Sequence, residues 1–161
     1  MTKIPLVIEE LHRSETKLVH DLLRLSDRHK PDHDIHHLAR DLAGWSRDHV
    51  AELSRVGRRF DLDLDADAGD GDGVLSVLRQ KGADLLGRRP EPALLLLADL
   101  RHLYRDASGV SLDWELLAQA AQSTKDQELL DVAERCHPET LRQARWANAM
   151  LKELSAQALV T

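Results

Sequence analysis

The chain has 161 residues, a net charge of −6 and one cysteine, and leucine and alanine dominate a composition with 3% aromatic residues. This length suits one domain with its own hydrophobic core, and the composition is typical of an all-α protein. Acidic and basic residues are interleaved and no apolar run approaches the roughly 20 residues of a membrane span, so we expect neither a nucleic-acid nor a membrane partner. A single cysteine excludes an internal disulfide and, with no signal-peptide pattern in the sequence, favours a cytoplasmic location.

Two helices are predicted in the first 60 residues. The first should span residues 5–29, because proline is tolerated in a first helical turn and the following Lys-Pro-Asp sequence ends the apolar pattern. The second should begin at Asp32 or His33 and continue to about Phe60, forming an antiparallel hairpin with the first. Four polar residues of the first helix lie off its apolar face and are expected to be solvated: His12, Arg13, His20 and Asp21.

Residues 61–73 carry six aspartates and three glycines. No register places these aspartates, a glycine and a final glutamate as an EF-hand calcium loop requires, so a mobile acidic linker is the better interpretation. Residues 74–87 then read as a short helix, and a proline-containing segment over 88–92 closes it.

Two further helices are predicted in the second half of the chain. One begins near Pro92 with a regular apolar face, although Gly109 and a possible cap at Ser111 could divide it. The other follows a turn at residues 123–126 and runs to about Ala158, with a kink expected at Pro138. Four helices with a crossover of roughly 30 residues between the second and third predict an all-α, ferritin-like four-helix bundle in a single domain.

Two polar residues occupy positions that the helical pattern reserves for apolar ones, namely Glu15 in the first helix and His49 in the second. With about 1.5 Å of rise per residue and level helix ends, both fall at one height in the bundle. The same height falls near Asp106 in the third helix and at His137 in the fourth, so these four residues are expected to share one layer.

Two neighbours extend this set. His102 lies one turn from Asp106, and the level argument does not separate them; Glu134 precedes His137 by three residues in a Glu-x-x-His pattern that carboxylate-bridged metal bundles use. Buried carboxylates and imidazoles are costly unless they are paired or bind a cation. Either a metal ion binds in this layer, with these six residues as candidate ligands, or the four residues Glu15, His49, Asp106 and His137 satisfy one another as a buried salt-bridge layer.

The chain resembles the ferritin-like superfamily, and within it the stress-induced YciF-like branch. The context of Glu15 fits the early glutamate of that family, and His49-Val50 fits its Glu-Thr-x-x-His-Val-x-x-Leu pattern. The resemblance implies a di-iron site, with a further acidic ligand position near Cys136-His137. Two departures stand out: Trp45 replaces a bridging glutamate, and Arg101 replaces the carboxylate before His102.

These departures argue against ferroxidase activity, because a di-iron site needs about four carboxylates. If Arg101 points inward, it would pair with Glu15 in place of a metal. The resemblance still implies a metal-binding protein with a stress or metal-handling role, holding iron, zinc or manganese. The alternative is a metal-free, non-catalytic scaffold or partner-binding bundle. A homodimer is expected from leucines outside the main apolar faces, such as Leu23, Leu116, Leu129 and Leu141.

Overall fold

A computed structural model of the chain describes residues 2–70 and 91–161, and four long helices account for most of these two ranges. They are α1 (Ile4–Arg28), α2 (His33–Gly57), α4 (Pro92–Thr124) and α5 (Gln127–Val160), with a short 3₁₀ helix η1 (Arg58–Phe60) after α2. The all-α class and the four long helices predicted from the sequence are therefore confirmed. The helix expected over 74–87 lies outside the described residues.

Side-chain caps explain where two of these helices begin. Asp32 accepts a hydrogen bond from the Ile35 amide at 3.2 Å at the start of α2, and Asp126 accepts one from the Leu129 amide at 3.1 Å at the start of α5. Each cap satisfies an amide that has no partner within its helix. Between α4 and α5, Lys125 adopts a left-handed conformation with φ of 56°, which reverses the chain after one helix and before the next.

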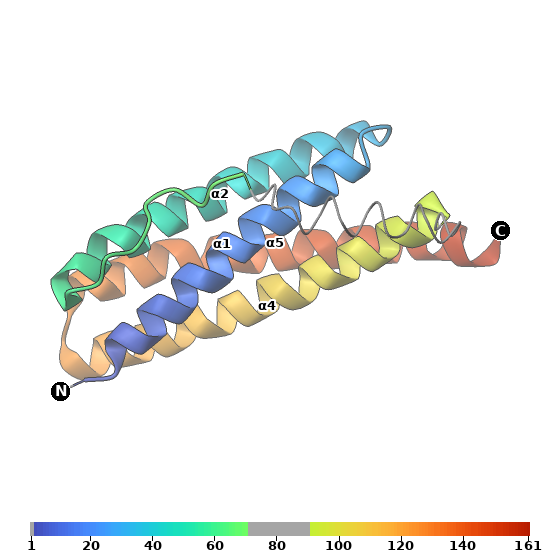
Figure 1. The fold of residues 1–161 in the computed structure, drawn as a ribbon. Helices are drawn as coiled ribbons and strands as arrows, with labels where there is room; N and C mark the ends of the chain where they lie inside the picture. The colour runs from blue at the N-terminus through green and yellow to red at the C-terminus, as the bar shows by residue number, and fades with distance from the viewer. Residues whose placement is uncertain (1, 71–90) are drawn as a thin grey trace.

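Helix directions follow from the contacts between helices (Figure 1). Helix α1 is antiparallel to α4, since Lys17 contacts Asp106 and the later Arg28 contacts the earlier Asp99. Helix α5 is antiparallel to α2, since the late Arg55 of α2 contacts the early Glu128 of α5 and the earlier Leu42 contacts the later Gln143. The two hairpins α1–α2 and α4–α5 complete the bundle. Helices α2 and α4 therefore run in the same direction, and the end of α2 lies at the opposite end of the bundle from the start of α4.

One continuous apolar core joins all four helices. Helix α4 is not divided at Gly109, because Val110 and Trp114 continue its buried face beyond that position. Helix α5 likewise continues through Pro138. Of the four leucines expected to lie on a dimer surface, Leu129 is fully buried, Leu23 packs against the core, Leu141 is half-buried and Leu116 is exposed. None of the described helices is both long and apolar enough to cross a membrane.

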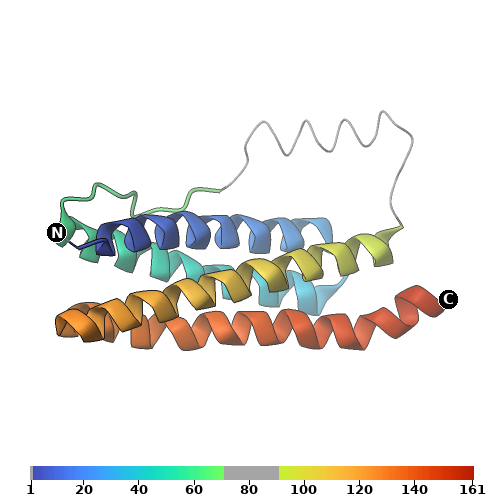
Figure 2. The same cartoon turned by 90° about the horizontal axis from the view of Figure 1, so that it is seen from below.

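Residues 61–70, which we call the strap, lie along the α1–α2 hairpin (Figure 2). The aspartates of the strap face outward, whereas Leu62 and Leu64 pack against the core and Ala68 is buried. Gly57 permits this approach, since a Cβ atom there would lie 3.2 Å from Leu64 Cδ1. The alternation of aspartate with apolar residues thus produces a docked segment.

Three side chains of the hairpin hold the strap by its backbone carbonyls. Ser54 Oγ donates to the Leu64 carbonyl at 2.8 Å, while His12 and His20 donate through Nε2 to the carbonyls of Asp65 and Ala68, each at 2.7 Å. The expectation of a mobile linker is therefore wrong for residues 61–70, and residues 71–73 lie outside the described part. The expectation that His12 and His20 are simply solvated is also wrong, because the strap uses both as donors.

We expect the double variant His12→Ala/His20→Ala to loosen the strap while the bundle stays folded. The variant loses two hydrogen bonds, each contributing about 0.5–1.5 kcal/mol, and the free energy needed to open the strap falls by their sum. Amide exchange over residues 61–70 should therefore become about tenfold faster or more. Hydrogen–deuterium exchange with mass spectrometry measures this. His33→Ala, which changes an exposed histidine at the start of α2, is the control. Equal exchange in all three proteins would contradict the docking.

Candidate functional site

A buried carboxylate joins three helices at the centre of the bundle. Glu15 of α1 has no exposed surface, and His49 of α2 is 2% exposed. His49 Nδ1 lies 2.9 Å from Glu15 Oε1, and Trp114 of α4 donates from Nε1 to the same oxygen at 2.8 Å. A buried carboxylate is costly without such donors, so these two contacts make the position of Glu15 tolerable.

The charge of Glu15 also sets the protonation of His49. Burial by itself lowers the pKa of His49, but the adjacent Glu15 carboxylate outweighs burial and raises it, with Glu139 of α5 acting in the same direction. His49 Nε2 lies 3.6 Å from Glu139 Oε1. His49 therefore keeps its second proton to a higher pH than an ordinary histidine, and its two ring nitrogens face the carboxylates of Glu15 and Glu139.

This pair does not fit the di-metal site that the resemblance implies. His49 Nδ1 and Glu15 Oε1 are hydrogen-bonded to each other, and the other ligating atoms of the pair, His49 Nε2 and Glu15 Oε2, are buried without a hydrogen-bond partner. Among the described residues, no third ligating group completes a metal-sized cluster around them. Trp45 packs against the core at the position of the bridging glutamate. Arg101 is exposed, so the expectation that it could point inward and pair with Glu15 is wrong.

The other four expected ligands lie elsewhere. Asp106 and His102 sit together between α1 and α4, beside Asp21. His137 is partly exposed and faces Glu115 at 3.5 Å, and Glu134 is exposed. The structure thus separates the residues that level helix ends would place in one layer.

The separation comes from the position of α4 along the bundle. Asp99, about two turns into α4, already contacts Arg28 and His29 at the end of α1. Helix α4 therefore begins beyond the α1–α2 turn, and Trp114 occupies the height of Glu15. Asp106 lies eight residues earlier on α4, which is about 12 Å along the helix axis.

The second polar group, which we call the α1–α4 cluster, consists of Asp21, His102, Asp106 and Lys17. His102 Nε2 lies 3.4 Å from Asp21 Oδ2 and 3.2 Å from Asp106 Oδ2. Lys17 Nζ lies 2.7 Å from the same Asp106 oxygen. Each helix contributes two residues four positions apart, so they share a helical face.

Asp21 is the buried member of this cluster, with 7% exposure, and the expectation that it is solvated is wrong. Burial and the neighbouring Asp106 carboxylate raise the pKa of Asp21 to about 8. Burial acts on Asp106 in the same direction, but Asp21, Lys17 and His102 outweigh it and lower the pKa of Asp106. Two carboxylates this close do not both ionise readily, so the proton resides on Asp21 near neutral pH.

The α1–α4 cluster has the donor set of a divalent metal site. One ligand atom from each of Asp21, His102 and Asp106 falls within 4.8 Å of the others. Ligands about 2.0–2.2 Å from a tetrahedral metal lie about 3.3–3.6 Å apart, close to the two distances measured from His102. Asp21 Oδ2 is buried and has no hydrogen-bond partner in the protein, which a bound cation would provide.

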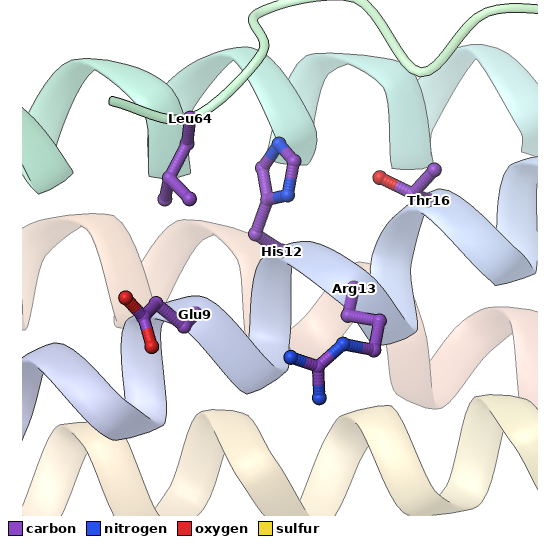
Figure 3. A pocket seen from close by; sticks show the side chains of 5 residues that line it. All are labelled: Glu9, His12, Arg13, Thr16 and Leu64. Atoms are coloured by element: carbon purple, nitrogen blue, oxygen red, sulfur yellow. The ribbon is translucent and has the colours of Figure 1, made fainter. Parts of the chain in front are cut away.

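A shallow hollow of about 490 Å³ lies between α1 and the strap, lined by Glu9, His12, Arg13, Thr16 and Leu64. Figure 3 shows His12 pointing towards the strap and Arg13 away from it. Two of the polar side chains here have partners, since His12 donates to the Asp65 carbonyl and Arg13 pairs with Glu10, whereas the Thr16 hydroxyl is buried without one. The hollow is separate from both polar groups described above.

Sequence reasoning missed four contributors to these sites: Lys17, Asp21, Trp114 and Glu139. A signal existed for Trp114, because a tryptophan on a buried face needs an acceptor for its indole N–H.

Comparison of the chain with protein-family models, curated proteins and solved structures finds no match. The resemblance to ferritin-like proteins therefore depends on the sequence motifs alone.

The Glu15–His49 pair should make stability depend on pH. Because the pKa of His49 is raised on folding, its stabilisation is complete below the ordinary histidine pKa of about 6.5 and is lost as pH rises through the higher value of the folded chain. We expect the free energy of unfolding of the natural chain, measured relative to Glu15→Gln/His49→Gln, to fall as pH rises above about 6.5. Urea unfolding at several pH values measures it. If the difference in unfolding free energy between the natural chain and the double variant does not change with pH, the His49 imidazole is neutral in the folded chain.

Proposed function

We propose that this chain is a metal-binding bundle of the ferritin-like type, and that it binds one divalent ion through Asp21, His102 and Asp106. The observation that carries the proposal is the convergence of these three ligand atoms from two helices within 4.8 Å. The buried, unpartnered Asp21 Oδ2 supports it further, because a cation would satisfy an oxygen that water does not reach.

Two carboxylates and one imidazole suit zinc, manganese or iron(II), and water would complete the coordination on the exposed side. His102 is exposed and Asp106 partly exposed, so the ion would have a direct path from solvent. Such a site needs no cavity in the core of the bundle.

A metal-handling or stress role is proposed together with the ferritin-like assignment. The two antiparallel hairpins and the parallel direction of α2 and α4 support that assignment, since a long crossover produces this arrangement. We propose binding rather than catalysis. The α1–α4 cluster offers two carboxylates, fewer than the four of a di-iron oxidase, and burial raises the pKa of the Cys136 thiol, which makes it a poor nucleophile.

A metal-free scaffold or partner-binding bundle, also proposed as a homodimer, is the second candidate. The contacts of Glu15 with His49 and Trp114 favour it, because they give the core carboxylate two donors within the protein, although its Oε2 atom is buried without a partner. Leu112 and Leu116 also favour it, since they lie one turn apart on α4 and are 61% and 59% exposed. Neighbouring exposed leucines are suited to contact with another protein or a second copy.

Metal content distinguishes the two candidates. We expect untagged protein to bind about one equivalent of zinc or manganese, Asp21→Asn/Asp106→Asn to bind none, and Glu15→Gln/His49→Gln to bind as the natural chain does. Elemental analysis after gel filtration measures the stoichiometry. Saturating metal, at about 100 times the dissociation constant, should stabilise the natural chain by about 2.7 kcal/mol in thermal unfolding.

The paired variants also show where any metal is held. Loss of metal in Glu15→Gln/His49→Gln, with retention in Asp21→Asn/Asp106→Asn, would move the site to the core and contradict the proposal. No metal in the natural chain, with an unchanged melting temperature, would favour the scaffold.

A further inference from the structure

The Lys17 ammonium lies against the same three ligand atoms that a bound ion would use. Its Nζ atom lies 2.7 Å from Asp106 Oδ2, 3.5 Å from His102 Nε2 and 3.8 Å from Asp21 Oδ2. Lys17 thus approaches all three proposed ligands, and it does so on the ligand atoms themselves.

We propose that Lys17 is a tethered competitor for the metal, so that an ion enters the α1–α4 cluster by displacing its ammonium group. This inference depends on the proposed metal binding at the same cluster. A charged ammonium has three donors and no acceptor, so it does not act as a metal ligand. A dication on these ligands would also repel it strongly at a separation of about 4 Å.

The location of Lys17 makes displacement feasible. Its side chain is 55% exposed, and its stem is flexible, so the ammonium can move into solvent without any helix moving. The dication would itself neutralise Asp21 and Asp106, and Lys17 is then no longer needed as their counter-charge. Arg24 differs, since it approaches the other oxygen of Asp21, Oδ1, at 3.7 Å and leaves the ligand atoms free.

A tethered competitor lowers the affinity of the site for a divalent ion. Each ion must displace an ammonium group held at very high effective concentration, and the returning lysine assists release of the ion. We therefore infer an exchangeable site, suited to taking up and passing on a divalent ion rather than keeping one permanently.

The test compares Zn²⁺ affinity of the natural chain with that of Lys17→Met, using isothermal titration and competition with a chromophoric chelator. Methionine keeps the length of the stem and removes the charge, so we expect Lys17→Met to bind Zn²⁺ about tenfold more tightly or more. Lys17→Arg retains a cation and should bind no more tightly than the natural chain. Lys30→Met, which changes an exposed lysine in the α1–α2 turn, should leave affinity unchanged.

The outcomes separate this inference from the proposed function. If the natural chain binds Zn²⁺ and Lys17→Met binds it equally or more weakly, Lys17 is not a competitor although the metal site stands. If neither protein binds, the proposed function and the competitor both fail. The role of Lys17 as a competitor is supported if Lys17→Met binds Zn²⁺ more tightly than the natural chain, or binds it when the natural chain does not. Thermal unfolding without metal confirms that each variant is folded.

Discussion

The contacts of the buried Glu15 carboxylate fix how the helices lie against one another. A carboxylate without exposed surface is tolerated only where donors meet it, and His49 and Trp114 come from two other helices. A shift of α2 or α4 by one turn would move its donor about 5.4 Å away and leave Glu15 unpaired. Apolar packing alone tolerates such shifts far better, because leucine faces repeat every turn. The second hairpin is held similarly, with Gln143 of α5 donating to the Leu42 carbonyl and to Ser46 Oγ of α2.

The two polar groups of the bundle differ in their surroundings. Around Glu15 the donors are aromatic or heterocyclic side chains packed in the core, both on Oε1, and Oε2 is buried without a partner. The α1–α4 cluster lies at the edge of the same interface, where His102 reaches solvent and Asp21 does not. Its buried carboxylate depends on a proton, a lysine or another cation to balance the neighbouring Asp106. The convergence of two carboxylates and an imidazole at a partly open position is what makes this cluster, and not the core pair, the proposed cation site.

The sequence predicted the parts of the molecule that local patterns determine. Helical spacing, the expected helix start at Asp32 or His33 and the turn at residues 123–126 placed the helices, and two polar residues on apolar faces identified Glu15 and His49 as partners. The position of α4 along the bundle was harder to predict, because the spacing of apolar residues within a helix does not show where that helix begins relative to the α1–α2 turn. An error of about two turns there joined Asp106 to the wrong layer and hid Asp21, which looks solvated on a helical wheel. The docking of the strap also depends on tertiary contacts, since His12 and His20 are ordinary surface residues until its carbonyls reach them.

The two donors to Glu15 lie at different distances from it along the chain, and the order in which the two hairpins form depends on this difference. His49 is 34 residues from Glu15, within the α1–α2 hairpin, whereas Trp114 is 99 residues away. Closing the longer loop has the greater entropic cost, so the hairpin should form first. His49 then provides Glu15 with a hydrogen-bond donor before the core closes, and Trp114 completes the set when the α4–α5 hairpin docks. The first hairpin is thereby protected from carrying an unpaired carboxylate on its apolar face, and the docking step selects the register in which the indole meets that carboxylate.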